Sequence, residues 1–519
     1  MIRIVRQFRV EILLFLILLA CYAYFPPRWA DWNQNSRLNL TLAIVDDRSF
    51  QIDRFVANTG DYAKYNGHYY SDKAPGTSFL AVPVYAVVRP VLQTVPVQRF
   101  IERLGSSAAF GETLRPGGSG LATEKVYFAL VLMIVSFATV AVPSALLGVV
   151  LYRFLELFGL ATGWRVMIAL IYGLATPAFP YSNTFVGHQQ VAALLFGAFW
   201  LVFLIGRQRL SPRWMLVVGF LLGWTLITEY PAALIIAGIG LYAIIILPDR
   251  RWIVGAALAG IPPLALMMAY NYAIFGTVLP VGYKYSELWQ AEHQSGFMSL
   301  AGPNREALWG ITFGVHRGLF LLAPVLLTGL AGFVAWWRAG IYRRELAVCI
   351  WAVASFLLFN GSSVMWSGGF GVGPRYLVPM LPFLAFGMGA FLAMWGALAG
   401  AGDAGHHRWL VVAECVGAND RRAEFSAVST ESVAGLFAAR TCRRQCGAQP
   451  GHGAESQRLV EPAAAGAVSG GEHHRALFRD PWLWHDGTRR SAGCESARGC
   501  GLKAVPDRRV QLQGKPRQL

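Results

Sequence analysis

Long apolar segments alternate with short polar gaps from about residue 124 to residue 398. Each apolar segment has roughly 17 to 29 residues, and a helix of about 20 residues can cross the hydrocarbon core of a bilayer. Together with an apolar segment near the N-terminus, this pattern predicts an all-α polytopic membrane protein with about ten transmembrane helices. The expected spans are residues 10–25, 124–151, 164–181, 188–206, 213–229, 231–248, 252–275, 317–337, 345–361 and 376–398.

The basic residues predict the orientation, because Lys and Arg collect in every second gap. The basic gaps are residues 152–165, 206–213, 248–251 and 337–344. The alternate gaps are residues 181–188, 229–231, 275–316 and 360–375. Basic loops stay on the cytoplasmic side of a membrane. We therefore expect a protein of the cell membrane with a cytoplasmic N-terminus and its long loops outside.

The apolar segment 77–95 does not fit this alternation. If it crossed the membrane, every later loop would face the wrong side, and it contains Pro83 and Pro90. We expect it to lie on the outer face or to dip into it, where protein or a water-filled cavity covers its backbone. Residues 27–123 then form one large external loop with juxtamembrane helices, inside a transmembrane domain of residues 1–398.

The sequence changes character near residue 400. Residues 399–519 contain no segment long enough to span a membrane, and almost all of their basic residues are Arg. Two interpretations compete: a disordered basic tail, or translation of a GC-rich gene in a shifted reading frame. The absence of both periodicity and repeats favours the second. Cys442 and Cys446 have no partner pair at zinc-finger spacing, so we assign no metal site and no disulfide.

Composition supports the membrane interpretation. Hydrophobic residues make up 55% of the 519 residues and charged residues only 14%, while the net charge is +16. The basic residues lie mainly in the expected inner loops and in the tail, so orientation and contact with anionic lipid explain them. We expect membrane lipids as partners and no nucleic acid.

The first external loop holds the densest cluster of polar residues. Residues 36–53 fit a short helix ending near Asp46 and Asp47, although the apolar alternation also fits a strand. Carboxylates at a helix C-terminus oppose its dipole, which indicates a role, but a solvated acidic turn explains them equally well. Residues 59–76 contain four tyrosines and Lys73. They fit a sugar or phosphate surface, or an aromatic belt at the membrane interface.

Short motifs in this loop resemble the GT-C membrane glycosyltransferases, in particular the branch of protein O-mannosyltransferases and lipid A aminoarabinose transferases. The motifs are Thr59-Gly60-Asp61, Asn66-Gly67-His68-Tyr69-Tyr70 and Asp72-Lys73-Ala74-Pro75, in the order found in that branch. The resemblance covers residues 1–398. It implies an enzyme that transfers a sugar from a polyprenyl-phosphate donor to a lipid, glycan or protein acceptor on the outer face, generally with inversion.

Such a reaction needs a base for the acceptor hydroxyl and cations for the departing phosphate. The candidate bases are Asp46, Asp47 and His188. The candidate phosphate-binding residues are Lys73, Arg375 and Arg37. The candidate substrate-binding residues are Asp61, Tyr70, Asp72 and Glu229. We assign no cofactor and leave a divalent metal open.

Two positions depart from the family pattern. When the sequence is aligned on Arg37, Gln34 and Asn35 stand where the family has an acidic pair, so Asp31, Asp46 or Asp47 must supply the carboxylate. Asp46 and Asp47 are the preferred candidates. His188 stands where the family tends to have Asp. Plain alternatives remain: snorkelling for Arg375, a helix cap for His188 and a polar turn for Glu229.

A multi-pass transporter or flippase for lipid or solute is the alternative class. The expected spans contain almost no charged residues away from their ends. Transporters usually need ionisable residues or broken helices near the middle of the membrane. The pattern therefore favours the enzyme.

The expected topology can be tested by cysteine accessibility. A Ser106→Cys substitution should react with a membrane-impermeant thiol reagent from outside, like Asn66→Cys, because segment 77–95 does not return the chain to the cytoplasm. Labelling of Ser106→Cys only from the cytoplasm would contradict this topology and make 77–95 a true span.

Overall fold

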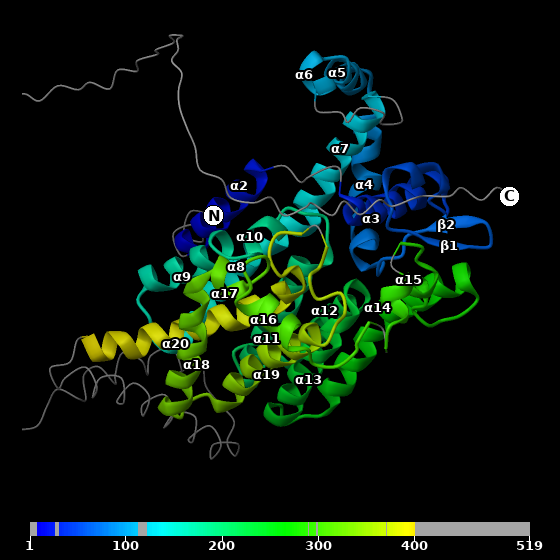
Figure 1. Ribbon diagram of the computed structural model, residues 1–519. Helices are drawn as coiled ribbons and strands as arrows, with labels where there is room; N and C mark the ends of the chain where they lie inside the picture. Colours follow the sequence, from blue (N-terminus) through cyan, green and yellow to red (C-terminus); the bar gives the residue numbers. More distant parts are fainter. Residues whose placement is uncertain are drawn as a thin grey trace, which may run out of the picture. The chain divides into compact units, whose positions relative to one another are not determined.

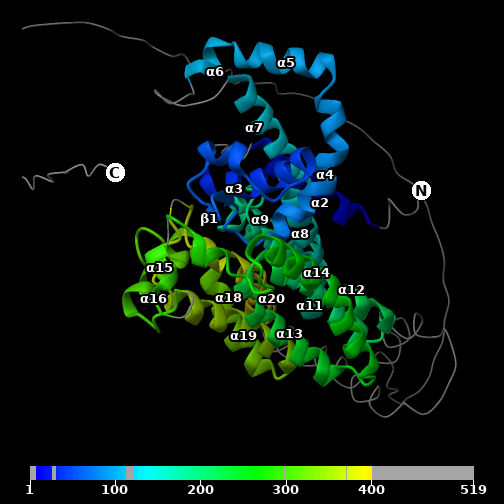
Figure 2. The same ribbon diagram turned by 90° about the vertical axis from the view of Figure 1, so that its right-hand side faces the viewer.

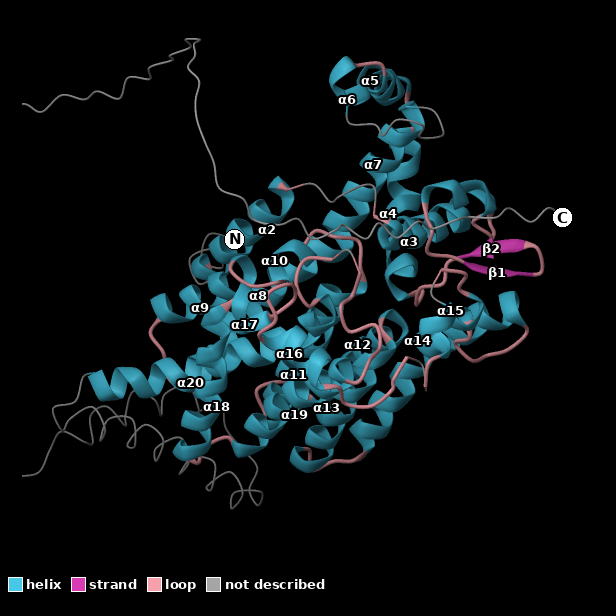
Figure 3. Ribbon diagram, in the orientation of Figure 1, coloured by secondary structure: helices cyan, strands magenta, loops and turns pink. Residues whose placement is uncertain are grey.

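Helices form almost all regular structure in the computed structural model, which describes residues 8–25, 31–112, 122–288, 290–296, 299–369 and 371–399 (Figures 1 and 3). Within these ranges, the one sheet is an antiparallel hairpin of β1 (Ala63–Tyr65) and β2 (His68–Tyr70). The prediction of a mostly helical chain is confirmed. The expectations for the tail after residue 399 lie outside the described residues.

The N-terminal helices are α2 (Arg9–Tyr24), α3 (Trp32–Leu42), α4 (Gly76–Leu92), α5 (Val95–Gly105) and α6 (Ala108–Glu112). The next are α7 (Ala122–Ser136), α8 (Val142–Phe154), α9 (Thr162–Leu174), α10 (Ala178–Tyr181), α11 (Gly187–Gly206), α12 (Met215–Thr228), α13 (Ala233–Ile246) and α14 (Arg251–Phe275). The last are α15 (Gln290–Gln294), α16 (Arg305–Thr312), α17 (Leu319–Leu322), α18 (Leu327–Ala339), α19 (Arg343–Gly361) and α20 (Leu381–Ala399).

Short helices of other types join these elements. The π-helical segments are Ala43–Asp47 and Phe137–Ala141. The 3₁₀ helices are Asp53–Asn58, Leu155–Phe158, Pro212–Trp214, Tyr230–Ala232, Gly282–Tyr285, Pro324–Leu326 and Arg375–Met380.

Several helices are suited to a membrane by length and composition. In the described part of the chain there are five: Glu124–Phe158, Gly187–Gly206, Arg251–Phe275, Arg343–Gly361 and Arg375–Gly396. The pair of α4 and α5 makes a sixth if it is one broken span, and three apolar helices are shorter. The chain is thus a candidate multi-pass membrane protein. The count of ten spans and their orientation stay predictions.

The apolar segment 77–95 forms α4, and α5 follows it at an angle of 90°. Thr94 has an extended backbone and Pro96 stands in the first turn of α5, so the helix cannot continue through this point. Figure 2 shows α5 lying across the end of α4. This bend fits a re-entrant segment, as expected, and equally a broken span.

Glycines allow the bundle helices to approach closely. A Cβ atom on Gly219 of α12 would lie 1.9 Å from the carbonyl oxygen of Ala256 in α14, and one on Gly223 would lie 2.6 Å from that of Gly260. Gly332 of α18 meets the carbonyl of Gly387 in α20 in the same way. Small residues four apart let helix backbones touch, which is typical of membrane helices.

Helix α3 is buried on nearly all sides, although most of its residues are polar. The Asn39 side chain pairs with that of Asn58 at 2.8 Å, and the hydroxyls of Ser36 and Ser71 are 2.8 Å apart. Because buried polar groups must be hydrogen-bonded, these contacts fix the loop segments around α3. The expected helix in residues 36–53 is confirmed: it begins at Trp32 and continues as a π-helix to Asp47.

The glycine contact between α12 and α14 predicts a matched pair of results. Gly219→Ala should lower the apparent Tm of the purified protein, because the added methyl group meets backbone. Gly240→Ala in α13, where nothing lies within 4 Å of the added Cβ, should leave Tm unchanged or raise it slightly, since Ala is the better helix former. Equal Tm values for the two variants would contradict this packing.

Candidate functional site

A pocket of about 610 Å³ opens where the segment 31–73 meets the ends of several bundle helices. Its ionisable lining residues are Asp31, Arg37, Asp61, Lys73, His188, Glu229, Glu292 and Arg375. Its aromatic lining residues are Trp32, Tyr230, Tyr283 and Tyr376. The fold therefore gathers residues from five regions of the sequence around one cavity.

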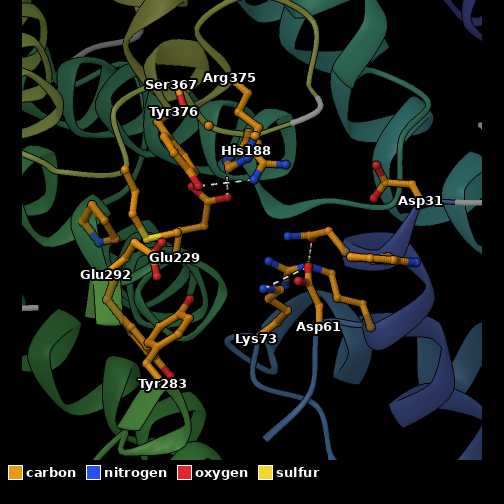
Figure 4. A pocket seen from close by; sticks show the side chains of 18 of the residues that line it. Asp31, Asp61, Lys73, His188, Glu229, Tyr283, Glu292, Ser367, Arg375 and Tyr376 are labelled. Carbon is orange, nitrogen blue, oxygen red and sulfur yellow. Dashed lines mark hydrogen bonds and ion pairs between the residues drawn. The ribbon is translucent and has the colours of Figure 1, made fainter. Parts of the chain in front are cut away.

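The pocket has two walls (Figure 4). Asp31, Asp61 and Lys73 lie on one wall, which the N-terminal elements build. His188 and Arg375 lie on the other wall, together with three labelled neighbours from later elements, Glu229, Tyr283 and Tyr376. A ligand in the cavity would contact both the first loop and the bundle.

Lys73 forms a buried ion cluster with two carboxylates. Its Nζ lies 3.1 Å from Asp61 Oδ2 and 3.2 Å from Asp72 Oδ1, and the three side chains are at most 10% exposed. Burial lowers the pKa of Lys73, but the charges of Asp72 and Asp61 outweigh it, and the pKa is raised above its ordinary value. The ammonium therefore stays charged at neutral pH.

Asp72 connects this cluster to a second long loop. The hydroxyl of Ser286 donates to Asp72 Oδ2 at 3.0 Å, and Ala63 of β1 pairs with Ser286 through a backbone bridge. Ser286 directly follows the 3₁₀ helix that carries Tyr283 into the pocket. Burial raises the pKa of Tyr283, so its phenol stays protonated and can donate a hydrogen bond.

Arg37 is committed to the first loop. Its Nε donates to Asn33 Oδ1 at 3.1 Å, and its Nη1 donates to the carbonyl of Ala74 at 2.9 Å. The backbone carbonyl of Arg37 also accepts from Ser78. This arginine therefore positions the turn that carries Lys73 as well as lining the pocket.

Arg375 has few partners. Its Nη2 donates to the hydroxyl of Tyr376 at 3.2 Å, while its buried Nε has no hydrogen-bond partner among the described residues. No described carboxylate lies within ion-pair distance of it. Arg317 donates to the carbonyls of Gly369, Gly371 and Gly373, which fixes the turn before Arg375.

His188 and Glu229 are in direct contact in the pocket. His188 Nδ1 lies 2.5 Å from Glu229 Oε1, and the imidazole stands edge to face against the rings of Tyr181 and Tyr376. A Cβ atom on Gly187 would lie 2.9 Å from Glu229 Oε1, so the start of α11 must approach this carboxylate closely. The pair ties α11 to the end of α12.

Asp31 lines the pocket, although the sequence pattern favours Asp46 and Asp47 as the carboxylate base. It caps the N-terminus of α3, because its Oδ1 accepts from the backbone N–H of Gln34 at 3.1 Å. No described cation forms an ion pair with it. The spacing Asp31-x-x-Gln34 before a helix is a capping signature and could have located it.

The structure brings six of the ten candidate site residues into the pocket. They are Arg37, Asp61, Lys73, His188, Glu229 and Arg375. Asp72 lies behind Lys73, and Tyr70 packs on Phe275 in a neighbouring apolar cluster. The catalytic roles stay predictions.

Asp46 and Asp47 are not among the residues that line the pocket. Asp46 lies 2.6 Å from Arg89 Nε and accepts from the hydroxyl of Tyr85 at 3.0 Å, so it joins the π-helix to α4. Asp47 pairs with Arg54 at 3.6 Å on the surface. These contacts give both carboxylates a structural explanation, and the proposal below does not use them.

No group of three or more His, Cys, Asp or Glu side chains that could hold a metal ion occurs in the described ranges. The pocket carboxylates do not converge on one point. Asp61 pairs with Lys73 on one wall, and Glu229 contacts His188 on the other.

Comparison with protein-family models gave no match, and neither did comparisons with curated proteins and with solved structures. The resemblance to GT-C glycosyltransferases therefore rests on the motifs of the first loop and on the predicted topology.

The ion cluster predicts that Lys73→Ala harms stability as well as activity. Removing the ammonium leaves two buried carboxylates without their counter-charge, and loss of one partner of a buried pair costs about 3–5 kcal/mol. We expect a lower apparent Tm, partly restored by adding Asp61→Asn. Lys64→Ala should leave Tm unchanged, because the Lys64 pair with Glu287 is exposed. An unchanged Tm for Lys73→Ala would show that the cluster does not hold the first loop.

Proposed function

We propose that this protein is a glycosyltransferase whose active site is the pocket. It transfers a sugar from a polyprenyl-phosphate donor to an acceptor hydroxyl at the outer face of the cell membrane. The observation that carries the proposal is Arg375, a partly buried guanidinium with no carboxylate within ion-pair distance among the described residues and with Asp31 across the pocket.

Arg375 is suited to the phosphate of the donor. A guanidinium without a counter-ion in a partly buried site favours an anionic ligand, and it can hold two phosphate oxygens at once. The charge on phosphate grows as its bond to the sugar breaks, so a fixed cation there stabilises the transition state more than the ground state. Lys73 on the opposite wall is already compensated by Asp61 and Asp72, so we assign it to holding the first loop rather than to the phosphate.

Asp31 is suited to the base. Its carboxylate lines the pocket, has no ion-pair partner among the described residues and retains an oxygen that the helix cap does not use. In the reaction, the acceptor oxygen bonds to the anomeric carbon while the bond from that carbon to the phosphate oxygen breaks. Polyprenyl phosphate leaves with the electron pair, and Asp31 takes the acceptor proton.

The two walls suit this division of roles. An inverting displacement needs the attacking and leaving oxygens on opposite faces of the anomeric carbon, and Asp31 and Arg375 lie on opposite walls of the pocket. The His188–Glu229 pair lies beside Arg375 and holds the start of α11 in place. We assign it a positioning role next to the donor.

The membrane supplies the donor chain in this proposal. The pocket lies at the ends of apolar helices that are suited to a bilayer, so a lipid tail can stay among them while its headgroup enters the pocket. The full topology would have ten spans, a cytoplasmic N-terminus and a first loop of residues 27–123 outside.

Substitutions in the two walls test this function. With the purified protein in nanodiscs and a panel of radiolabelled polyprenyl-phosphate sugars, Arg375→Ala and Asp31→Asn should each reduce transfer by roughly 10²-fold or more. Arg375→Lys should retain part of the activity. Lysine keeps the positive charge but, as a single point charge, cannot hold two phosphate oxygens as the arginine fork does. Arg305→Ala, which removes an exposed arginine of α16 outside the pocket, is the control and should change transfer little.

Two results would contradict the proposal. One is transfer that continues undiminished in both pocket variants. The other is movement of intact lipid-linked sugar across the bilayer without cleavage, which would favour the transporter class.

A further inference from the structure

We propose that the acceptor is a saccharide and that Trp32, Asn33 and Asp31 form its binding site. This inference rests on the proposed function and extends it, because neither the motifs nor the reaction distinguishes lipid, glycan and protein acceptors. The three residues are consecutive, and all of them line the pocket at the start of α3.

Trp32 offers a fixed aromatic surface inside the pocket. Its backbone carbonyl accepts from the hydroxyl of Thr59 at 2.8 Å. A Cβ atom on Gly60 would lie 2.9 Å from its ring, so Gly60 packs directly against the indole. Despite this packing, Trp32 remains 50% exposed. A large apolar ring left half open in a polar pocket is suited to covering by a ligand.

Asn33 and Asp31 supply complementary hydrogen-bonding groups beside this ring. The amide oxygen of Asn33 accepts from Arg37 Nε, which leaves its two N–H donors free of protein partners among the described residues. One oxygen of Asp31 accepts from the backbone of Gln34, and the other can accept a further bond. Neighbouring hydroxyls of a sugar ring can donate to the carboxylate and accept from the amide.

The charges in this part of the pocket disfavour an anionic acceptor. Asp31 lines the cavity without an ion-pair partner in the described part of the chain, whereas the cations on the same wall are already engaged, Lys73 by Asp61 and Asp72 and Arg37 by Asn33 and Ala74. A phosphate or carboxylate acceptor beside Trp32 would be repelled by the Asp31 carboxylate. A neutral polyhydroxylated ring avoids that cost and gains contact with the indole, whose face packs well on the C–H side of a sugar.

The test is a comparison of acceptors by wild-type protein and matched tryptophan variants. Neutral methyl hexosides and disaccharides are compared with a Ser/Thr peptide and a phosphorylated saccharide. Trp32→Ala should raise the KM for saccharide acceptors about tenfold or more, Trp32→Tyr should restore most of the affinity, and the donor KM should change less than about threefold. Trp309→Ala, at a tryptophan 64% exposed on α16 outside the pocket, should leave the acceptor KM unchanged.

Saturation-transfer NMR with the same methyl hexosides gives a readout that does not need transfer. Wild-type protein in nanodiscs should transfer saturation to the ring C–H protons of the sugar. The Trp32→Ala variant should lose this saturation-transfer signal, and the Trp309→Ala variant should keep it. Preference for the peptide, or equal saccharide signals in wild type and Trp32→Ala, would overturn the proposal. If no donor is cleaved by any variant, the glycosyltransferase function fails, and the NMR result still decides whether Trp32 binds a saccharide.

Discussion

The buried ion cluster of Lys73 with Asp61 and Asp72 is the interaction on which the site depends. Charges removed from water are tolerated only when opposite charges and hydrogen bonds compensate them. Here each carboxylate lies within 3.2 Å of the ammonium, and Ser286 donates to Asp72 from a distant loop. The cluster thus joins the wall of the pocket that the first loop builds to the segment that carries Tyr283.

The pocket cations differ in how far the protein already satisfies them. Lys73 is neutralised by two carboxylates, and Arg37 is tied to a side chain and a carbonyl of its own loop. Among the described residues, Arg375 donates to the hydroxyl of Tyr376, lies over the Tyr376 ring and has no carboxylate within ion-pair distance. A new anion therefore gains most at Arg375, because a ligand there need not displace an existing ion pair. This difference, rather than the number of basic residues, supports the assignment of the donor phosphate.

The sequence predicted the helical bundle because long apolar segments are a local property of the chain. It also located Lys73 and Arg375, since polar residues in the gaps between such segments stand out. The close approach of α12 to α14 was not anticipated, because it depends on which glycines face each other. The helix ending at Asp47 was predicted, but its surroundings were not.

The candidate site shows the same limit. Asp46 and Arg89 are far apart in the sequence, and only the fold reveals that they pair and that Asp46 serves to anchor α4. Asp31 has a helix-capping spacing but no local sign of a base, and Trp32 has no distinctive spacing at all; contacts with Thr59 and Gly60 hold Trp32 at the pocket. Residues whose role depends on a partner in another segment cannot be ranked from local pattern alone.

The most direct test of the central claim is the stereochemical fate of the donor. Purified full-length protein in nanodiscs would receive a polyprenyl-phosphate sugar of known anomeric configuration together with acceptor, and NMR would follow the anomeric proton and the phosphorus. The account predicts loss of the phosphodiester signal, appearance of polyprenyl phosphate and a product of inverted anomeric configuration. A donor that stays intact in correctly inserted protein with every sugar offered, or a product of retained configuration, would contradict it.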